Sequence, residues 1–208
     1  MLIRRLFTGF FWFFATAISL VSFAVALGAT ATGFQQVAPH LIHYVSDYRV
    51  PLYLHMVFGP LALLLMPFQF WQGLRDRYRG VHRLLGYGYA VSIAIASIGS
   101  LLLLPRFQGS PWATSGFAIL AVLWVATTAR GVMLARAGNT VAHRAWMMRS
   151  ASLTFAAVVL RLMTIPLMAT GMTLTQSYDI TAWASWLLPL AVIEVSRLRP
   201  KRAAAMGT

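Results

Sequence analysis

Long apolar segments separated by short polar ones dominate the chain. Six apolar runs are long enough to cross the roughly 30 Å hydrocarbon core of a bilayer as helices. Their limits are 6–27, 51–71, 84–104, 115–134, 150–172 and 181–198. Because only helices and closed barrels satisfy the backbone in lipid, the pattern predicts an all-α, polytopic membrane protein, a single bundle of six transmembrane helices.

The composition agrees with lipid as the surrounding solvent. Of the 208 residues, 59% are hydrophobic and 10% are charged, which is too few charges to cover the surface of a soluble domain. The chain has no Cys, which excludes disulfides, iron–sulfur clusters and covalently attached c-type haem. Any metal would therefore need ligands from the five His and four acidic residues.

The basic residues predict the orientation of the helices. Alternate polar segments hold 13 Lys and Arg residues, whereas the opposite side holds only Arg49 and Arg106. By the positive-inside rule both termini are cytoplasmic, as in a multi-pass protein of the bacterial inner membrane. The net charge of +13 would also attract anionic lipids, or serve orientation alone. No nucleic-acid-binding motif accompanies it. The first run is longer and more aromatic than a signal-peptide core, so we expect an uncleaved helix.

The longest outer loop, 28–50, contains a candidate metal site. Pro39 favours the start of a short interfacial helix over 39–48. On an α-helix His40, His43 and Asp47 would share one stripe, and His55 follows one turn inside the second apolar run. Three His and a carboxylate would suit zinc or copper. Alternatively, these residues form the polar face of the helix, and His55 bonds to a neighbouring carbonyl.

Two inner loops share a His-Arg pair. His82-Arg83 precedes the third apolar run and His143-Arg144 precedes the fifth, 61 residues later. Two tandem helix hairpins would place these histidines at one membrane depth, where they could clamp the iron of a b-type haem. Arginines nearby would pair with its propionates; the candidates are Arg79, Arg83, Arg144 and Arg149. Alternatively, both histidines are ordinary polar residues at helix starts.

Besides Arg197 at the end of the last run, three charged residues lie inside apolar runs, where an unpaired charge is expensive. Arg161 is near the middle of the fifth run, and Arg130 and Glu194 lie in the fourth and sixth. We expect Glu194 to pair with Arg130 or Arg161, as a structural ion pair, a proton relay or an anionic-ligand site. The small residues Gly86, Gly88, Ser92 and Ala96 form one face of the third run, which favours close helix packing.

Several strings together resemble a bacterial family known only as predicted membrane proteins with a domain of unknown function. The resemblance runs from about residue 52 to 195. It is carried by His55-x-x-x-Gly59, Pro67-Phe68-Gln69-Phe70, His82-Arg83-x-x-Gly86, His143-Arg144-x-Trp146-Met147-x-Arg149, Leu160-Arg161, and Trp186-x-x-Pro189 with Glu194. At Gly86-Tyr87-Gly88 the family more often has Arg at the second position, so a ligand contact from that side chain is absent here. The resemblance implies topology and candidate residues but no activity.

Three classes of function fit these features. The first is a b-type haem redox protein that uses His82 and His143. The second is an accessory or lipid- or quinone-binding subunit of a membrane complex or a homodimer. The third is a small transporter that uses Arg161 and Glu194. The motifs of soluble enzymes, such as a nucleophile elbow or a phosphate loop, are absent.

Overall fold

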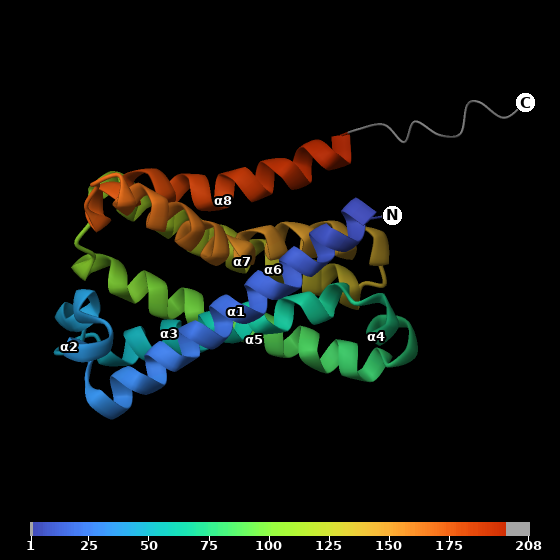
Figure 1. The fold of residues 1–208 in the computed structure, drawn as a ribbon. Helices are drawn as coiled ribbons and strands as arrows, with labels where there is room; N and C mark the ends of the chain where they lie inside the picture. Colours follow the sequence, from blue (N-terminus) through green and yellow to red (C-terminus); the bar gives the residue numbers. More distant parts are fainter. Residues whose placement is uncertain (1, 199–208) are drawn as a thin grey trace, which may run out of the picture.

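The computed structural model describes residues 2–198 as an elongated bundle of helices (Figure 1). Within this range the chain contains helices and short connections but no strand. The basic residues Arg199, Lys201 and Arg202 lie outside the described residues. The elements in chain order are α1 (Leu2–Thr32), α2 (Phe34–Val37), the 3₁₀ helix η1 (Pro39–Tyr44), α3 (Arg49–Phe70), α4 (Gln72–Arg77), α5 (Arg79–Leu103), the 3₁₀ helix η2 (Leu104–Arg106), α6 (Pro111–Arg136), α7 (Thr140–Ala169) and α8 (Leu174–Leu198).

Five helices of the described chain are long and apolar enough to span a membrane: α1, α3, α5, α6 and α7. The all-α, multi-pass prediction is therefore confirmed in outline. The sixth predicted span, 181–198, lies within α8, which falls outside the five because Asp179, Glu194 and Arg197 lower its hydropathy. In Figure 1, α8 nevertheless runs alongside α7, and the N-terminal end of α1 and the C-terminal end of α8 lie at the same end of the bundle.

Most helices begin earlier than their apolar runs. The fifth run was expected from residue 150, but α7 starts at Thr140 because the side chain of Asn139 accepts a hydrogen bond from the backbone N–H of Ala142. Ser110 caps α6 in the same way through the N–H of Ala113. Caps satisfy the free N–H groups of a first turn, so helices extend past the apolar core into polar sequence.

The predicted interfacial helix at 39–48 is shorter and tighter than expected. Its N-terminal half forms η1, whereas 45–47 turns toward α3, for which Tyr48 is the N-terminal flanking residue. Because a 3₁₀ helix has three residues per turn rather than 3.6, the assumed stripe of His40, His43 and Asp47 does not form. Asp47 lies beyond the end of η1.

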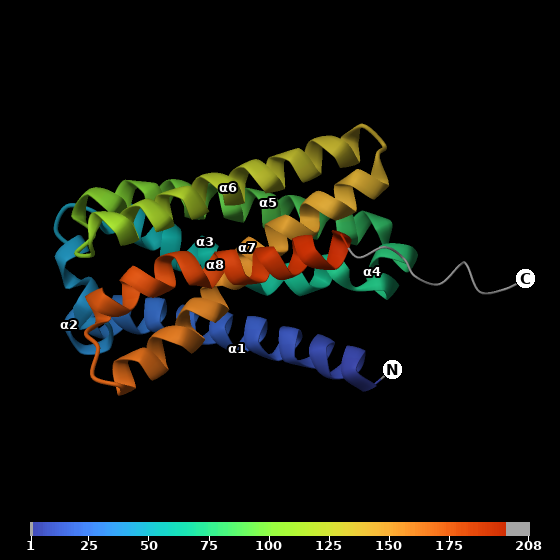
Figure 2. The ribbon, with the colours of Figure 1, turned by 90° about the horizontal axis from the view of Figure 1, so that it is seen from above.

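The helices form two layers, with α1, α3 and α5 in one and α6, α7 and α8 in the other (Figures 1 and 2). The predicted small-residue face of α5 is confirmed as a packing surface against α3, since Ser92 and Ala96 are buried. Further along the same helix, a Cβ built on Gly99 would lie 2.7 Å from the carbonyl oxygen of Pro51 in α3. Small residues let two backbones approach closely where lipid supplies no hydrophobic drive to associate.

A hydroxyl network joins the two layers at the centre of the bundle. The hydroxyl of Tyr89, a side chain only 1% exposed, lies 2.8 Å from Ser150 Oγ and 2.6 Å from Thr154 Oγ1. Trp124 Nε1 donates to Thr154, and Thr128 hydrogen-bonds to Ser150. These five side chains, the Tyr89 network, fix α5, α6 and α7 against one another because each buried polar group finds its partner in another member.

Removing the Tyr89 hydroxyl should weaken this junction. We predict that Tyr89→Phe lowers the free energy of unfolding by about 1 kcal/mol, since Ser150 and Thr154 retain other partners. The unfolding midpoint in detergent would then fall by roughly 2–4 °C. Tyr78→Phe is the matched control because that tyrosine is exposed at the surface. Equal midpoints for the two variants would contradict a structural role of the network.

Candidate functional site

The two predicted histidines occupy equivalent positions on α5 and α7. His82 and His143 are each the fourth residue of their helix. Seven residues, or two turns, further along lie Tyr89 and Ser150, which are directly hydrogen-bonded and also 61 residues apart. Residues seven apart share a helix face, so His82 and His143 lie below this contact on the facing sides of α5 and α7. The rings are close enough for their charged forms to repel each other.

The hydrogen bonds of the two rings differ. His143 Nδ1 lies 2.8 Å from the carbonyl oxygen of Gly131 in α6. A carbonyl only accepts, so Nδ1 carries the proton and the lone pair is on Nε2, which is the arrangement typical of metal-ligating histidines. His82 Nδ1 is buried without a hydrogen-bond partner in the described chain, and so is the amide nitrogen of Gln69. A Cβ built on Gly86, one turn from His82, would lie 3.1 Å from Gln69 Oε1.

The arginines proposed as propionate partners divide into two groups. Arg79, Arg83 and Arg144 are exposed at the starts of α5 and α7, within three residues of the histidines in sequence. Arg149 is instead held by Glu194, and its guanidinium lies over the ring of Trp146 at 4.8 Å. Only the first group is therefore free to contact a ligand between the histidines.

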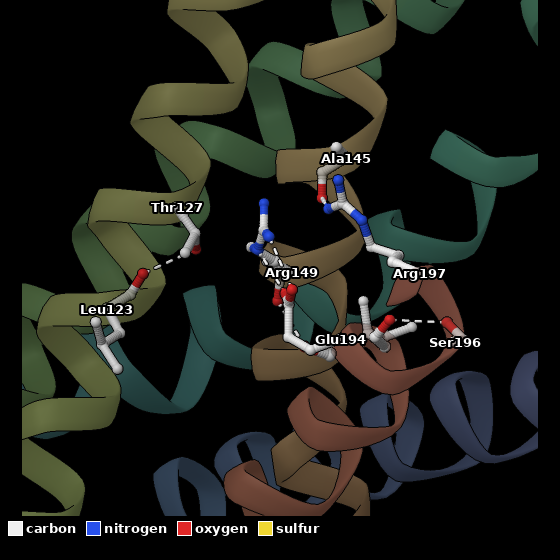
Figure 3. Close-up of polar contacts among 9 residues, drawn as sticks. Leu123, Thr127, Ala145, Arg149, Glu194, Ser196 and Arg197 are labelled. Carbon is white, nitrogen blue, oxygen red and sulfur yellow. Dashed lines mark hydrogen bonds and ion pairs between the residues drawn. The ribbon is translucent and has the colours of Figure 1, made fainter. Parts of the chain in front are cut away.

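The predicted partner of Glu194 was wrong. Arg149 Nε and one terminal nitrogen donate to the two carboxylate oxygens of Glu194 at 2.6 and 2.8 Å, a bidentate ion pair between α7 and α8 (Figure 3). Arg149 and Glu194 each lie 21 residues from the turn at 170–173, so antiparallel packing places them at one level. Arg161 is only nine residues from that turn and cannot reach Glu194. Arg130 is exposed on α6 and makes no ion pair within residues 2–198.

The predicted outer metal site is not assembled. No group of three or more His, Asp or Glu side chains suited to a metal occurs in the part of the chain that the structure describes. Asp47 pairs with Arg106, and His55 Nδ1 lies 3.1 Å from the carbonyl oxygen of Ala96. His40 remains near His43, and burial together with that neighbour lowers the pKa of His40. The geometry therefore favours the alternative to a metal site: His40, His43 and Asp47 are polar residues of the loop, and His55 bonds to a neighbouring carbonyl.

A second set of polar groups lies toward the opposite end of the bundle, where the sequence indicated only Arg161 and His55. Arg161 in α7 is close enough to interact electrostatically with His55 in α3 and with Tyr178 in α8, and Tyr178 is close enough to interact with Tyr44 in η1. Their helices are distant in sequence, and tyrosines occur throughout membrane helices, so the two phenols carried no pattern that would have marked them.

Comparison with known proteins gives one match. A family described as "Predicted membrane protein (DUF2306)" matches residues 52–196, more than half of the chain, and the protein belongs to this family. The match includes the histidines of α3, α5 and α7, and it excludes His40, His43 and Asp47. No curated protein and no solved structure matches the chain. The family and the apolar helices together establish a multi-pass integral membrane protein.

The ion pair between Arg149 and Glu194 should be a measurable link between α7 and α8. We predict a coupling free energy of about 1–2 kcal/mol in a double-mutant cycle of Arg149→Gln and Glu194→Gln, read from thermal unfolding in detergent. Partial exposure of both side chains keeps the value at the lower end of charge-assisted hydrogen bonds.

The matched control for that cycle is Asp76→Asn. Its carboxylate pairs with the adjacent Arg75 at the surface, with both side chains at least 40% exposed, so no measurable loss is expected. Strictly additive effects of the Arg149 and Glu194 substitutions would show that the pair contributes nothing to the packing of α7 and α8.

Proposed function

We propose that this DUF2306 protein is a b-type membrane redox protein in which His82 and His143 ligate haem iron from opposite sides. The observation that carries the proposal is the direct contact of Tyr89 with Ser150, two turns outward from each histidine. That contact joins α5 and α7 at equivalent positions and so supports a common depth for the two histidines.

The spacing of the helices supports this arrangement. α5 packs along α3 and α6 rather than directly along α7, and the Tyr89 side chain spans the gap between α5 and α7. A haem held between α5 and α7 would be ligated by His82 and His143.

The histidines meet the requirements of axial ligands unequally. His143 has its Nε2 lone pair free and its orientation fixed by the Gly131 carbonyl. His82 has a buried Nδ1 with no protein partner, so its ring is free to turn toward a ligand. Bound haem would supply one-electron chemistry, while Arg83 and Arg144 at the inner ends of the two helices would pair with its propionates.

The orientation predicted from the charges belongs to the same proposal. It places six spans in a bacterial inner membrane, with α8 as the sixth and both termini in the cytoplasm. The proposal is supported by α8 running alongside α7 and by the two ends of the described chain lying at one end of the bundle (Figure 1). The histidine pair would then face the cytoplasmic half of the membrane.

The transporter alternative has less support, because Glu194 is paired with Arg149 and not with Arg161. The accessory-subunit alternative is supported by the polar groups around Arg161.

The spectroscopic prediction is direct. Detergent-purified protein from haem-supplemented cells should show a Soret band and about one haem b per chain by pyridine haemochrome analysis. His82→Ala and His143→Ala should each abolish the low-spin spectrum because one axial ligand is lost. His143→Gly with added imidazole should restore part of it.

His40→Ala is the matched control for these substitutions, since His40 is exposed in the outer loop, and its spectrum should equal that of the wild type. Wild-type protein that shows no Soret band after haem supplementation, or a spectrum that survives both alanine substitutions, would refute the haem proposal.

The topology prediction uses reporter fusions. Fusions after Arg75, Arg144 and Lys201 should report a cytoplasmic location, and fusions after Tyr48, Gln108 and Tyr178 a periplasmic one. The fusion after Lys201 tests whether α8 spans the membrane. Two or more reversed reports would overturn the six-span orientation.

A further inference from the structure

Arg161 carries a positive charge at a depth where the described protein offers it no carboxylate. It lies eight residues before the end of α7 at Ala169, or about 12 Å along the helix axis at 1.5 Å per residue. No ion pair of Arg161 occurs within residues 2–198. A guanidinium in the outer third of a membrane is costly unless something neutralises it.

The side chain points away from the nearer membrane surface. One terminal nitrogen of Arg161 donates to the carbonyl oxygen of Ala157, one turn back toward the cytoplasmic end, at 2.8 Å. The other lies 3.4 Å from Ser22 Oγ in α1, a long contact. Arginines near helix ends commonly extend toward the water, but this one does not. Of the five N–H groups of a guanidinium, most remain without a described partner.

Other groups around Arg161 can donate hydrogen bonds. The hydroxyls of Tyr178 and Tyr44 have no hydrogen-bond partner in the described chain, although the ring of Tyr178 is fixed between Phe107 and Phe117. Burial, with a smaller effect of Tyr178, raises the pKa of Tyr44 to about 12, so its hydroxyl stays protonated at neutral pH. His55 in α3 adds no donor, because its Nδ1–H is directed to the Ala96 carbonyl and its Nε2 therefore carries the lone pair.

One unpartnered buried atom lies on α7 close to Arg161. Thr164 Oγ1 is buried without a hydrogen-bond partner in residues 2–198, and Thr164 follows Arg161 by three residues, or about one helical turn. Buried polar atoms without partners are few in native proteins, so this hydroxyl is a further group that a bound ligand could satisfy.

We propose that Arg161, Tyr178 and Tyr44 form a binding site for an oxyanion, a phosphate or carboxylate group, in the outer half of the bundle. One full positive charge and several O–H and N–H donors match a group that only accepts hydrogen bonds. A metal cation would be repelled by Arg161, and a neutral carbonyl would leave its charge uncompensated. Arg161 and His55 are both exposed on the bundle, so a ligand from the bilayer or from the outer aqueous side can reach them.

This site is independent of the proposed haem. His143 and Arg161 are 18 residues apart, which is five full turns, so they lie on one line of α7 about 27 Å apart along its axis. Loss of oxyanion binding would leave the spectrum of an inner haem unchanged, and the absence of haem would leave oxyanion binding intact.

The test is thermal unfolding of the delipidated full chain in a neutral detergent. Each protein is measured alone and with phosphatidylglycerol, phosphatidylcholine, inorganic phosphate or acetate. For the wild type we expect a rise in midpoint of roughly 5 °C with a saturating oxyanion ligand, by mass action on the folded state. A rise with phosphatidylglycerol alone assigns the site to a lipid headgroup. A rise with phosphate or acetate assigns it to a soluble anion.

The variants separate binding from structure. Arg161→Gln should lose the ligand-dependent rise yet be at least as stable as the wild type without ligand, because an uncompensated charge has been removed. Tyr178→Phe should reduce the rise and leave the ligand-free midpoint unchanged. Arg130→Gln is the matched control, since Arg130 is exposed on α6, and it should keep the full rise.

Two results would overturn the proposal. The first is a wild-type midpoint that responds to none of the four additives. The second is an Arg161→Gln protein that is less stable than the wild type without ligand and still gains the full rise, since Arg161 would then have a structural role only.

Discussion

The hydrogen bonds of the Tyr89 hydroxyl to Ser150 and Thr154 hold the rest of the structure in register. In lipid the helices gain nothing from burying apolar surface against each other, so packing of small residues and polar contacts between helices decide how they sit. Close packing fixes α3 on α5, and the two layers then meet through the Tyr89 network. Because this contact joins equivalent positions of α5 and α7, it also fixes how the two helices are rotated two turns nearer their starts, where His82 and His143 lie.

The polar groups of the bundle lie in two regions separated by an apolar layer. The two histidines and the Tyr89 network lie toward the end that holds both ends of the described chain, and Arg161 and His55 lie toward the opposite end. Between the Tyr89 network and the opposite end the core is filled by Leu63, Ile93 and Val158, each at most 1% exposed. A proton or electron path through the whole bundle would have to cross this apolar layer, which is why the two sites are better treated as separate functions than as one relay.

The sequence predicted what depends on local pattern and missed what depends on how helices align. Apolar run length and the small-residue face of α5 were sufficient for the helical class and for one packing surface. The start of α7 at Thr140 was not predicted because the apolar pattern gives no sign of a capping residue such as Asn139. Glu194 was assigned to the wrong arginine because depth was judged within each helix, whereas counting from the turn shared by α7 and α8 leads to Arg149. The Tyr89–Ser150 contact was accessible in principle, since the 61-residue offset that relates the histidines also relates these two residues.

Arg149 and Arg161, two arginines of α7, differ in how far the described chain neutralises their charge. Arg149 is neutralised by both oxygens of Glu194 and covered by Trp146, so its charge is satisfied within the chain. Arg161 has a backbone carbonyl and a distant serine, which contribute partial charges but no compensating negative one. On our proposal, a bound oxyanion supplies the missing negative charge for Arg161, and the hydroxyls of Tyr178 and Tyr44 suit such a group because it only accepts hydrogen bonds.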